Sequence, residues 1–478
     1  MELKFRHNLS LDHICDDEEN QWVLKFYMLF ISIAFLIAST IAITVTREYN
    51  FFDGLRRILT APSKLVIDYF QIGGLGSTLF NAAVCGLFCN FIIWVSRKKA
   101  TATTFAGYML VVAHCFYGLN FLNMWPPFFG VVVYCKVMKK SFRENIHVSF
   151  FSTALAPFIS DFMFRYTLSD NFAVDEPKVT ALGIFLALSF GLASGFVVPA
   201  LLPGTTAMHR GYNMYKAGLA LGMLGIFIYA FLFRTLGLES LPAISVENPA
   251  YSSLPYGYRQ FMNIFLTILF SLTLLIGFLL NHQSFKGYDA LIRSTGYGTD
   301  FFDKFKMPLC LINIGIYGIA IVGYLNLVFI LPEIFPELPA GVGFTGATSG
   351  VVFAALTFAA DGQHPRTVFP IAVGYSVLFV LVCFICKIAH LDIPWTLSTQ
   401  GYINGLAFAT GLCPFAGKYG FKIGVLAGFL SAVICTSTSP MHGGFVLYNG
   451  GFTAGLCALI LLPILDFYNV KPKHNDDV

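Results

Sequence analysis

The chain has 478 residues, of which 56% are hydrophobic and 12% are charged, and its mean hydropathy is +0.70. Because soluble domains carry about 25% charged residues, this composition excludes a soluble globular protein and predicts an integral protein of the lipid bilayer. The net charge of +4 is small and spread over loops, so it gives no indication of a nucleic-acid partner.

The N-terminal residues 1–20 form a leader of mixed charge that contains Asp16, Asp17, Glu18 and Glu19. A secretory signal has a basic start and an apolar core of about 7–15 residues. The apolar run that begins near Trp22 is longer than that, and the leader is acidic. We therefore expect a cytoplasmic leader and a retained first transmembrane helix.

Apolar runs of about 20 residues predict membrane-spanning helices, because a lipid-facing backbone must satisfy its own hydrogen bonds. The sequence predicts an all-α polytopic protein with about fourteen such segments in two groups of seven, some of them broken or re-entrant. The predicted organisation is a leader at 1–20, a first repeat at 21–235, a connecting loop at 236–257, a second repeat at 258–467 and a polar tail at 468–478. The runs begin near Trp22, Gly76, Thr103, Pro126, His147, Val179 and Gly211, and then near Phe261, Met307, Gly341, Val368, Tyr402, Phe421 and Gly444.

Two stretches of the chain repeat each other. Residues 191–222 align without a gap on residues 424–455 at a constant offset (424 − 191 = 233), and weaker matches follow in the same order elsewhere. Collinear matches along the whole length predict an internal duplication. The identical pairs are Gly191/Gly424, Gly195/Gly428, Phe196/Phe429, Thr205/Thr438, Met208/Met441, His209/His442, Gly211/Gly444, Tyr215/Tyr448, Gly218/Gly451 and Gly222/Gly455, and the weaker matches include Thr153/Thr410, Asp68/Asp300, Asn81/Asn313, Asp53/Asp289 and Phe105/Phe344.

An odd number of spans in each unit would turn the second copy upside down in the membrane. Lys and Arg are retained on the cytoplasmic side, and corresponding loops of the two copies have opposite charge bias. The basic segment 47–64 disagrees, and we interpret it as an amphipathic or re-entrant piece. The sequence therefore predicts an inverted repeat in the cell membrane with both termini cytoplasmic. The loops compared are Arg97, Lys98 and Lys99 against Glu333 and Glu337; Lys139, Lys140 and Arg143 against Lys387; and Asp161, Asp170, Asp175 and Glu176 against Lys418 and Lys422.

The duplicated segments 203–211 and 436–444 are short, polar and interrupted by Gly and Pro. In secondary transporters such segments bind the solute where inverted repeats meet. A neutral imidazole offers one donor and one acceptor and titrates near neutral pH, and hydroxyl groups add further partners. The candidate substrate-binding residues here are Thr205, Thr206, His209, Tyr215, Thr438, Ser439, His442, Tyr448 and Asn449.

A second interpretation of the same motif remains open. Pro-Met-His-Gly-Gly is also a good short turn, with the His near a helix end, the Met in packing and the Tyr as a membrane-interface anchor. Duplication alone would preserve both kinds of motif. Gly211 and Gly444, at the point where each helix restarts, are candidate hinges.

Two proline motifs, TALAPF at 153–158 and TGLCPF at 410–415, place a Pro inside a short apolar segment. A proline removes a helical hydrogen bond and frees a carbonyl, which makes Pro157 and Pro414 candidate hinges with Thr153 and Thr410 near the opening. A simple packing kink is the alternative.

Several other polar residues fall inside apolar runs. Asn81 and Asn313 lie early in matching spans and are candidates for the solute site, although contacts between helices are the default role of a buried amide. Asn120 and Asn123 have no counterpart and are candidates for a half-helix tip. Asp361 and His364 resemble a carboxylate–imidazole pair, but the adjacent Pro365 and Arg366 favour a solvated loop.

The sequence contains few acidic residues in the middle of its spans, which favours a neutral or weakly polar solute. It has no P-loop lysine motif, no His-Glu-x-x-His, no Gly-x-Ser-x-Gly and no dense Cys/His cluster. These absences argue against an ATP-driven pump or a zinc protease. We expect neither a cofactor nor a metal.

The duplicated Met-His-x-Gly and Thr-x-Leu-x-Pro-Phe motifs resemble those of a bacterial membrane-protein family that is known only as a duplicated domain of unknown function, and the likeness covers both halves. The seven-plus-seven layout is similar to that of nucleobase and anion carriers at the level of architecture. Residues 446–455 also resemble, over one short segment, the Tyr, Asn and Gly stretches of urea transporters. Such likeness implies a class of protein and no particular chemistry.

The leading hypothesis is a secondary transporter or facilitator for a small, mostly neutral polar solute, working by alternating access between the repeats. A membrane-embedded enzyme or lipid-handling protein that uses His209, His442 or Asp361 is one alternative, and a sensor or assembly partner is another. The sequence leaves a homo-oligomer open. A central cavity between the repeats would favour transport, whereas a lateral opening to lipid would favour lipid handling.

Overall fold

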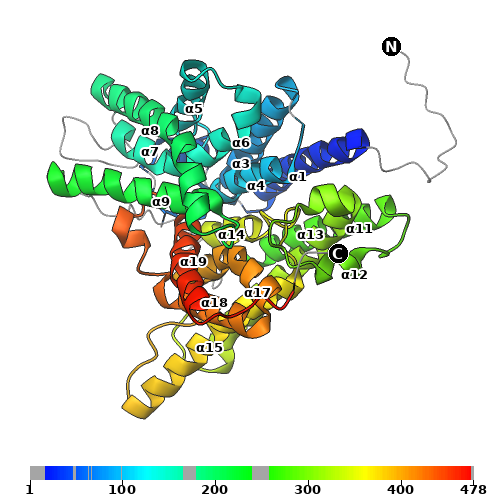
Figure 1. Cartoon of the computed structure of the whole chain (residues 1–478). Coiled ribbons are helices and arrows are strands. Elements are labelled where there is room, and N and C mark those ends of the chain that lie inside the picture. Colours follow the sequence, from blue (N-terminus) through cyan, green and yellow to red (C-terminus); the bar gives the residue numbers. More distant parts are fainter. Residues whose placement is uncertain are drawn as a thin grey trace.

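The computed structural model describes residues 17–46, 50–62, 64–65, 67–97, 99–164, 179–238 and 258–474, and its regular elements are helices (Figure 1). The first part of the chain contains α1 (Asp17–Val45), α2 (Phe51–Thr60), α3 (Tyr69–Val95), α4 (Ala102–His114), α5 (Trp125–Val137), α6 (Phe142–Ser152), η2 (Thr153–Leu155), α7 (Ala156–Phe164), α8 (Ala181–Met208), α9 (Lys216–Tyr229) and η3 (Ala230–Thr235). The second part contains α11 (Arg259–Leu280), α12 (Tyr288–Arg293), α13 (Phe301–Ile334), α14 (Gly346–Ala355), α15 (Pro365–Ala389), α16 (Gln400–Ala409), η4 (Thr410–Leu412), α17 (Cys413–Tyr419), α18 (Phe421–Ile434), η5 (Ser439–His442) and α19 (Asn449–Phe467).

The prediction of an all-α polytopic membrane protein is confirmed. Within the described residues, 9 helices are long and apolar enough to cross a bilayer. The predicted number of about fourteen is not reached there, because several of the expected spans form short helices. The runs expected to begin near Thr103, Pro126, Tyr402 and Phe421 correspond to α4, α5, α16 and α18, which have 13, 13, 10 and 14 residues. The leader 1–16 and most of the connecting loop, 239–257, lie outside the described residues.

The helices α3 and α13 share an unusual beginning. Asp68 and Asp300 are their N-caps, and each accepts a hydrogen bond from a backbone N–H of the first turn. A few residues later both helices contain a break, at Gly74 with φ of 81° and at Lys306 with φ of 67°. Gly adopts this left-handed backbone at little cost, whereas a lysine is strained there.

Asn81 and Asn313 make the same contacts in the two halves. The side-chain amide of Asn81 donates to the carbonyl oxygens of Cys115 and Leu119, at 2.9 and 3.0 Å. That of Asn313 donates to the carbonyl oxygens of Ala359 and Gln363, at 2.8 and 2.7 Å. In both halves these carbonyls belong to the turn that follows a short helix, α4 or α14. The paired amides therefore satisfy backbone groups that helix termination leaves without helical partners.

The N-caps of α4 and α14 define how the two halves correspond in this region. The hydroxyl oxygens of Thr101 and Thr345 accept from the N–H groups of Thr104 and Thr348. These pairs are 244 residues apart (345 − 101), the same separation as between Cys115 and Ala359. The sequence match of Phe105 with Phe344, at a separation of 239 (344 − 105), is therefore wrong as a structural equivalence.

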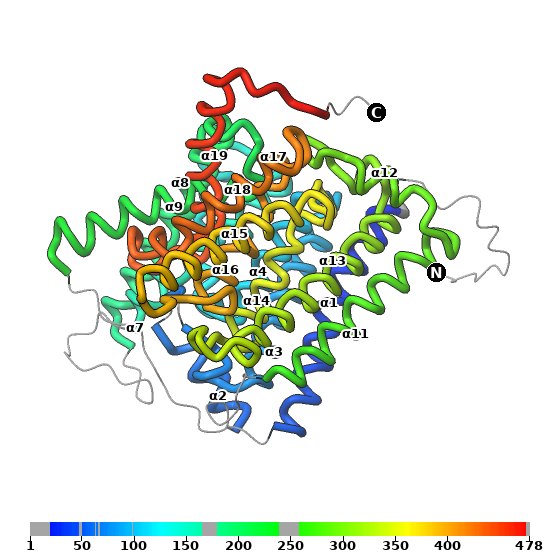
Figure 2. The backbone as a smooth tube through the Cα atoms, turned by 90° about the horizontal axis from the view of Figure 1, so that it is seen from below, coloured from blue at the N-terminus to red at the C-terminus, as the bar shows by residue number. Residues whose placement is uncertain are grey.

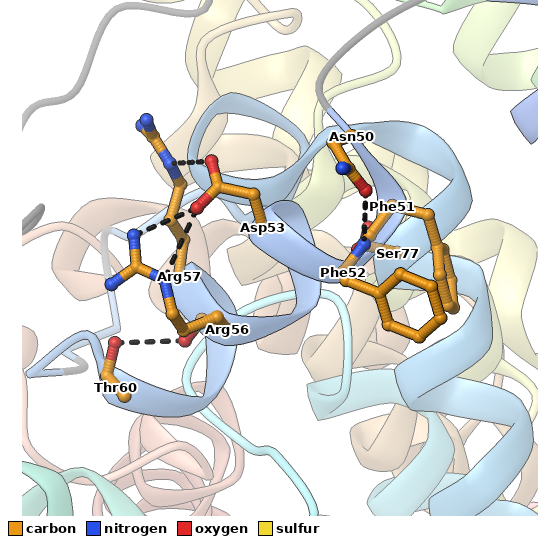
Figure 3. A network of polar contacts seen from close by, with 8 residues as sticks. All are labelled: Asn50, Phe51, Phe52, Asp53, Arg56, Arg57, Thr60 and Ser77. Atoms are coloured by element: carbon orange, nitrogen blue, oxygen red, sulfur yellow. Dashed lines mark hydrogen bonds and ion pairs between the residues drawn. The ribbon is translucent and has the colours of Figure 1, made fainter.

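The basic segment after α1 contains α2, a short helix that lies against the start of α3. A Cβ on Gly54 would collide with the carbonyl oxygen of Gly73, so the two backbones approach closely. On the exposed side Asp53 pairs with Arg56 and Arg57 at 2.9 and 3.0 Å (Figure 3). The hydrogen bond from Arg56 holds the pKa of Asp53 below its ordinary value. The corresponding helix α12 has a weaker pair, Asp289 with Arg293 at 3.9 Å.

Candidate functional site

One place where the two parts of the chain meet is the contact between α9 and α19, which lie side by side (Figures 1 and 2). A Cβ on Gly218 would collide with the backbone of Gly451, and one on Gly222 would collide with the ring of Phe452. The duplicated glycines Gly218 and Gly451 are therefore explained by close helix packing, which admits no side chain at the point of contact.

The contacts along α9 show the relative direction of the two segments. Gly218 faces Gly451, whereas Gly225, further along α9, faces Val446 and lies close to His442. The segment of the first part therefore runs in the opposite direction to the segment of the second part that it contacts. The local packing at this contact is antiparallel.

Two equivalent backbone hydrogen bonds connect the parts beside this contact. The N–H of Met214 donates to the carbonyl oxygen of Gly411, and the N–H of Leu447 donates to that of Ala154, each at 3.0 Å. Met214 and Leu447 precede α9 and α19, while Gly411 and Ala154 belong to the 3₁₀ turns η4 and η2. In each half, a residue just before α9 or α19 therefore packs against the 3₁₀ turn in the broken helix of the other half.

A cavity of about 40 Å³ lies at this contact. Because a buried water needs roughly 10–15 Å³ of such volume, the cavity has room for a molecule of only a few heavy atoms. Tyr215 and Tyr448, the N-cap residues of α9 and α19, both line it. The complete lining is Thr103, Leu110, Phe151, Met214, Tyr215, Lys216, Ala217, Gly218, Phe358, Asp361 and Tyr448.

The two tyrosines have equivalent positions and different hydrogen bonds. The Tyr215 hydroxyl donates to the carbonyl oxygen of Ala354 at 2.5 Å. The Tyr448 hydroxyl is buried and has no hydrogen-bond partner within the described part of the chain. A buried hydroxyl without a partner costs about 1–3 kcal/mol, so the Tyr448 hydroxyl is available to a bound molecule.

The broken helices beside the cavity carry Thr153 and Thr410. Each threonine hydroxyl donates to a carbonyl oxygen of the preceding turn, that of Phe150 or Ala407, at 2.7 Å. Gln363 also donates to the Thr410 hydroxyl, at 2.9 Å. The structure therefore brings both threonines toward the region where the halves meet, as the proline motifs suggest.

Charged groups reach the cavity only from the second half and from the start of α9. Lys216 and Asp361 line it, with Lys216 exposed and Asp361 half-buried. The residue that occupies the position of Lys216 in the second half is Asn449, and the residue that corresponds to Asp361 at the 244-residue offset is Tyr117. One approach to the cavity is therefore charged and the equivalent approach is neutral.

His209 and His442 are both fully buried but do not lie together. The Nε2 atom of His442 is 2.9 Å from the side-chain oxygen of Asn449, at the N-terminal end of α19. Arg210, the neighbour of His209, forms an ion pair at 2.8 Å with Asp466, near the other end of α19. Asn449 and Asp466 are about 26 Å apart along a helix that rises 1.5 Å per residue. The two imidazoles are therefore associated with opposite ends of one helix and do not form a shared pair.

The duplicated Met-His motif forms a turn in both halves. Gly211 and Gly444 have φ values of +81° and +75°, a conformation that favours glycine. The Met residues are exposed, and neither ring nitrogen of His209 has a hydrogen-bond partner among the described residues. Of the nearby hydroxyls, Thr205 donates to its own helix and Thr438 pairs with Thr453 at 2.7 Å, while Thr206 and Ser439 are half-buried.

The remaining predicted residues have structural positions at helix ends. Pro157 and Pro414 lie in the first turns of α7 and α17, directly after a 3₁₀ turn, where a proline removes no helical hydrogen bond. Asn120 and Asn123 lie in the turn between α4 and α5, where they donate to the carbonyl oxygen of Ile58 in α2 and to the hydroxyl of Ser160 in α7. The prediction of a solvated loop is wrong for His364, which is buried and 3.0 Å from the carbonyl oxygen of Ser294.

His114 is one residue that sequence reasoning missed. Its ring nitrogens lie 2.6 Å from the carbonyl oxygen of Leu110 and 3.0 Å from that of Leu447, and its ring is 5.0 Å from that of Tyr448. Phe358, at the 244-residue offset, contacts Tyr215 at the equivalent place, with ring centroids 4.8 Å apart but with the rings edge-on at 84°, against 37° for His114 and Tyr448. A His in an apolar run was the only signal in the sequence, and nothing there linked it to Tyr448.

The helices, the paired contacts and the shared cavity define a multi-pass membrane protein built from a duplicated unit. A family model described as "Protein of unknown function (DUF1576)" matches residues 47–234 and again residues 280–467. The chain belongs to this family, which confirms the expected resemblance to a duplicated domain of unknown function. No curated protein and no solved structure matches the chain.

Proposed function

We propose that the protein is a secondary transporter or facilitator for a small, mostly neutral polar solute. The observation that carries this proposal is the cavity at the contact between α9 and α19, which both halves line and into which Tyr448 brings a buried hydroxyl without a partner. A site shared by two repeats is the arrangement that many transporters use.

The solute chemistry follows from the groups around the cavity. Neither α9 nor α19 has a side-chain cap, and the first turn of α9 lines the cavity with Lys216, Ala217 and Gly218. The N–H groups of Lys216 and Gly218 donate to the carbonyl oxygens of Met214 and Tyr215. Such helix N-termini and tyrosine hydroxyls bind oxygen-bearing solutes. The small volume restricts the solute to a few heavy atoms.

Alternating access between two oppositely oriented halves is the mechanism that we propose. It is supported by the antiparallel contacts of α9 and by the reciprocal hydrogen bonds of Met214 and Leu447. The opposite charge bias of corresponding loops supports the same orientation, with both termini in the cytoplasm. Movement of the two halves would open the approach to the cavity beside one of the two tyrosines, Tyr215 or Tyr448, and close the approach beside the other.

The test is solute flux into proteoliposomes, followed by stopped-flow light scattering with formamide, acetamide and glycerol as probes. We expect saturable flux of at least one probe above that of empty vesicles. Tyr448→Phe and Tyr215→Phe remove one hydroxyl each and keep the ring, so both should reduce this flux. Tyr134→Phe on α5 is the matched control, because Tyr134 does not line the cavity.

Absence of flux for every probe would contradict the transport proposal. Flux that is unchanged in both tyrosine variants would show that the solute takes another route. His209→Ala and His442→Ala, tested in the same assay, report whether the duplicated turns take part.

A further inference from the structure

A second cavity, larger than the central one, lies inside the second half. It has a volume of about 960 Å³, and residues of α12, α13, α14, α15, α16 and α17 line it. Its inner end is formed by Ala407 and Thr410, and its rim carries Arg293, Arg366 and His474. A cavity of this size accommodates a molecule of roughly drug size, much larger than the small solute of the central site.

The cavity has an identifiable cause in the sequence. Five alanines line it, and three of them, Ala320, Ala372 and Ala407, have a phenylalanine as their counterpart in the first half. Their counterparts in the first half follow from the established offsets. Ala320 lies 232 residues after Phe88, the separation that also relates Asn81 and Asn313. Ala372 lies 244 residues after Phe128, the separation that relates Thr101 and Thr345. Ala407 lies 257 residues after Phe150, the separation that relates Thr153 and Thr410.

The three phenylalanines of the first half fill the equivalent space. The ring of Phe128 lies 5.5 Å from that of Phe88 and 6.3 Å from that of Phe150. Both Phe128 and Phe150 are buried. Three packed rings are thus replaced by three methyl groups, which leaves space between the helices of the second half.

One side of the cavity opens beside α13. Ala320 is exposed, Ala372 is half-buried and Ala407 is buried, so exposure decreases from the opening inward. On the same helix Ile319 and Leu327 are exposed apolar residues, as expected of a surface that faces lipid. An apolar molecule can therefore reach the cavity from the bilayer.

The rim is basic. Arg366 is exposed and has no ion pair among the described residues. Arg293 has only the 3.9 Å contact with Asp289, in which both side chains are largely exposed. Leu122 stands at the position of Arg366 in the first half, so this charge is specific to the second half. Guanidinium groups bind carboxylates and phosphates well.

A polar group inside the cavity also lacks a partner. Tyr317 lines it, is only 3% exposed, and its hydroxyl makes no hydrogen bond within the described part of the chain. Its counterpart Cys85, at the 232-residue offset, carries no hydroxyl. A bound molecule would supply the missing hydrogen bond.

We propose that this cavity binds an amphipathic anion, with an apolar chain between α13 and α15 and an acidic head at Arg293 and Arg366. The chain occupies the space that Ala320 and Ala372 leave open. The Tyr317 hydroxyl contacts a polar atom of the bound molecule. This site shares no lining residue with the central cavity, although Ala407 at its inner end contacts Tyr215, and the proposal does not depend on solute transport.

Photo-crosslinking tests the proposal on the full chain in nanodiscs of zwitterionic lipid. The probes are a diazirine-bearing palmitic acid, the corresponding fatty alcohol and a diazirine-bearing phosphatidylglycerol, and adducts are mapped by mass spectrometry. We expect an anionic probe to label the segments of α13 and α15 that line the cavity. Labelling by the free acid assigns a fatty acid, and labelling by the diacyl lipid alone assigns a membrane phospholipid.

Two sets of variants separate the two parts of the ligand. Ala320→Phe with Ala372→Phe restores rings of the first half and should abolish labelling, while Leu327→Phe on the exposed face of α13 should not change it. Arg366→Gln with Arg293→Gln should weaken apparent binding of the anionic probe about tenfold, the size of one charge-assisted contact. Weak labelling by the alcohol should be insensitive to the arginine variants.

Labelling that is unchanged in the double phenylalanine variant would overturn the proposed cavity site. Equal labelling by acid and alcohol, with no effect of the arginine variants, would overturn the anionic head. A melting temperature of each variant close to that of the unaltered protein shows that lost labelling is not lost folding.

Discussion

The two halves of the protein share their helix ends and differ in how the space between their helices is filled. Asn81 and Asn313 bind equivalent carbonyls, and Thr101 and Thr345 cap equivalent helices. In contrast, rings packed together in the first half are replaced by alanines around a cavity of about 960 Å³ in the second. Duplication has therefore kept the groups that satisfy a broken backbone, whereas the packing between helices was free to diverge.

This difference has a physical basis. Inside a membrane an unsatisfied backbone carbonyl has no water to bind, so its partner is under strong constraint. An apolar side chain that leaves a space open to lipid has a smaller cost, because a lipid or another apolar molecule can fill the space. The second half can therefore hold a ligand site at a place where the first half is solid.

The largest effect on stability is expected when an aromatic ring is removed from the first half, in contrast to adding a ring at the equivalent alanine of the second half. Phe128→Ala removes a buried ring from a packed cluster, which should lower the free energy of unfolding by about 3–5 kcal/mol. Ala372→Phe adds a ring to a cavity and should change stability little. Thermal unfolding of the purified protein measures both. Equal destabilisation by the two substitutions would contradict the account of the cavity.

A second comparison concerns the paired amides. Asn81→Leu and Asn313→Leu each keep the side-chain size but leave two carbonyls without their donor, and they also remove the acceptor of the Phe121 N–H and of the Tyr288 hydroxyl, respectively. Because an unsatisfied buried group costs about 1–3 kcal/mol, we expect similar losses of about 2–4 kcal/mol in both variants. Asn145→Leu, at a half-buried position on α6 where the side-chain amide donates to the carbonyl oxygen of Ser141 in the same segment, is the control. A large loss in only one variant would show that the halves are not equivalent here.

The smallest effect is expected at the breaks of α3 and α13. Gly74→Ala places a Cβ on a left-handed residue and should destabilise the protein by about 1 kcal/mol. Lys306→Gly removes the same strain and should stabilise it by a similar amount. Melting temperatures should thus move in opposite directions. A lower melting temperature for Lys306→Gly would mean that the lysine side chain contributes more than its backbone costs.

The sequence contained enough information to predict the class of protein. Apolar content and long apolar runs predict a polytopic helical membrane protein because only internally bonded helices are stable in lipid. The constant offset of residues 191–222 predicted the duplication, which the two family matches at 47–234 and 280–467 confirm. Some motif pairs also had the correct structural partners, as Asn81 and Asn313 show.

The sequence did not distinguish between three reasons for which a motif is retained in both halves. Gly211 and Gly444 repeat because a turn requires their backbone conformation, and Gly218 and Gly451 repeat because two helices touch there. Tyr215 and Tyr448 repeat at the shared cavity. All of these pairs look alike in an alignment, since duplication preserves turns, contacts and sites without distinction.

Local patterns of hydropathy and glycine or proline are properties of neighbouring residues, so the sequence alone determined the helical membrane class of the protein and its repeated unit. The position of His114 beside Tyr448, the separation of His209 from His442 and the alanine-lined cavity depend on contacts between residues far apart in the sequence. Only the tertiary structure decides such contacts, because they follow from how complete helices pack and not from any one segment.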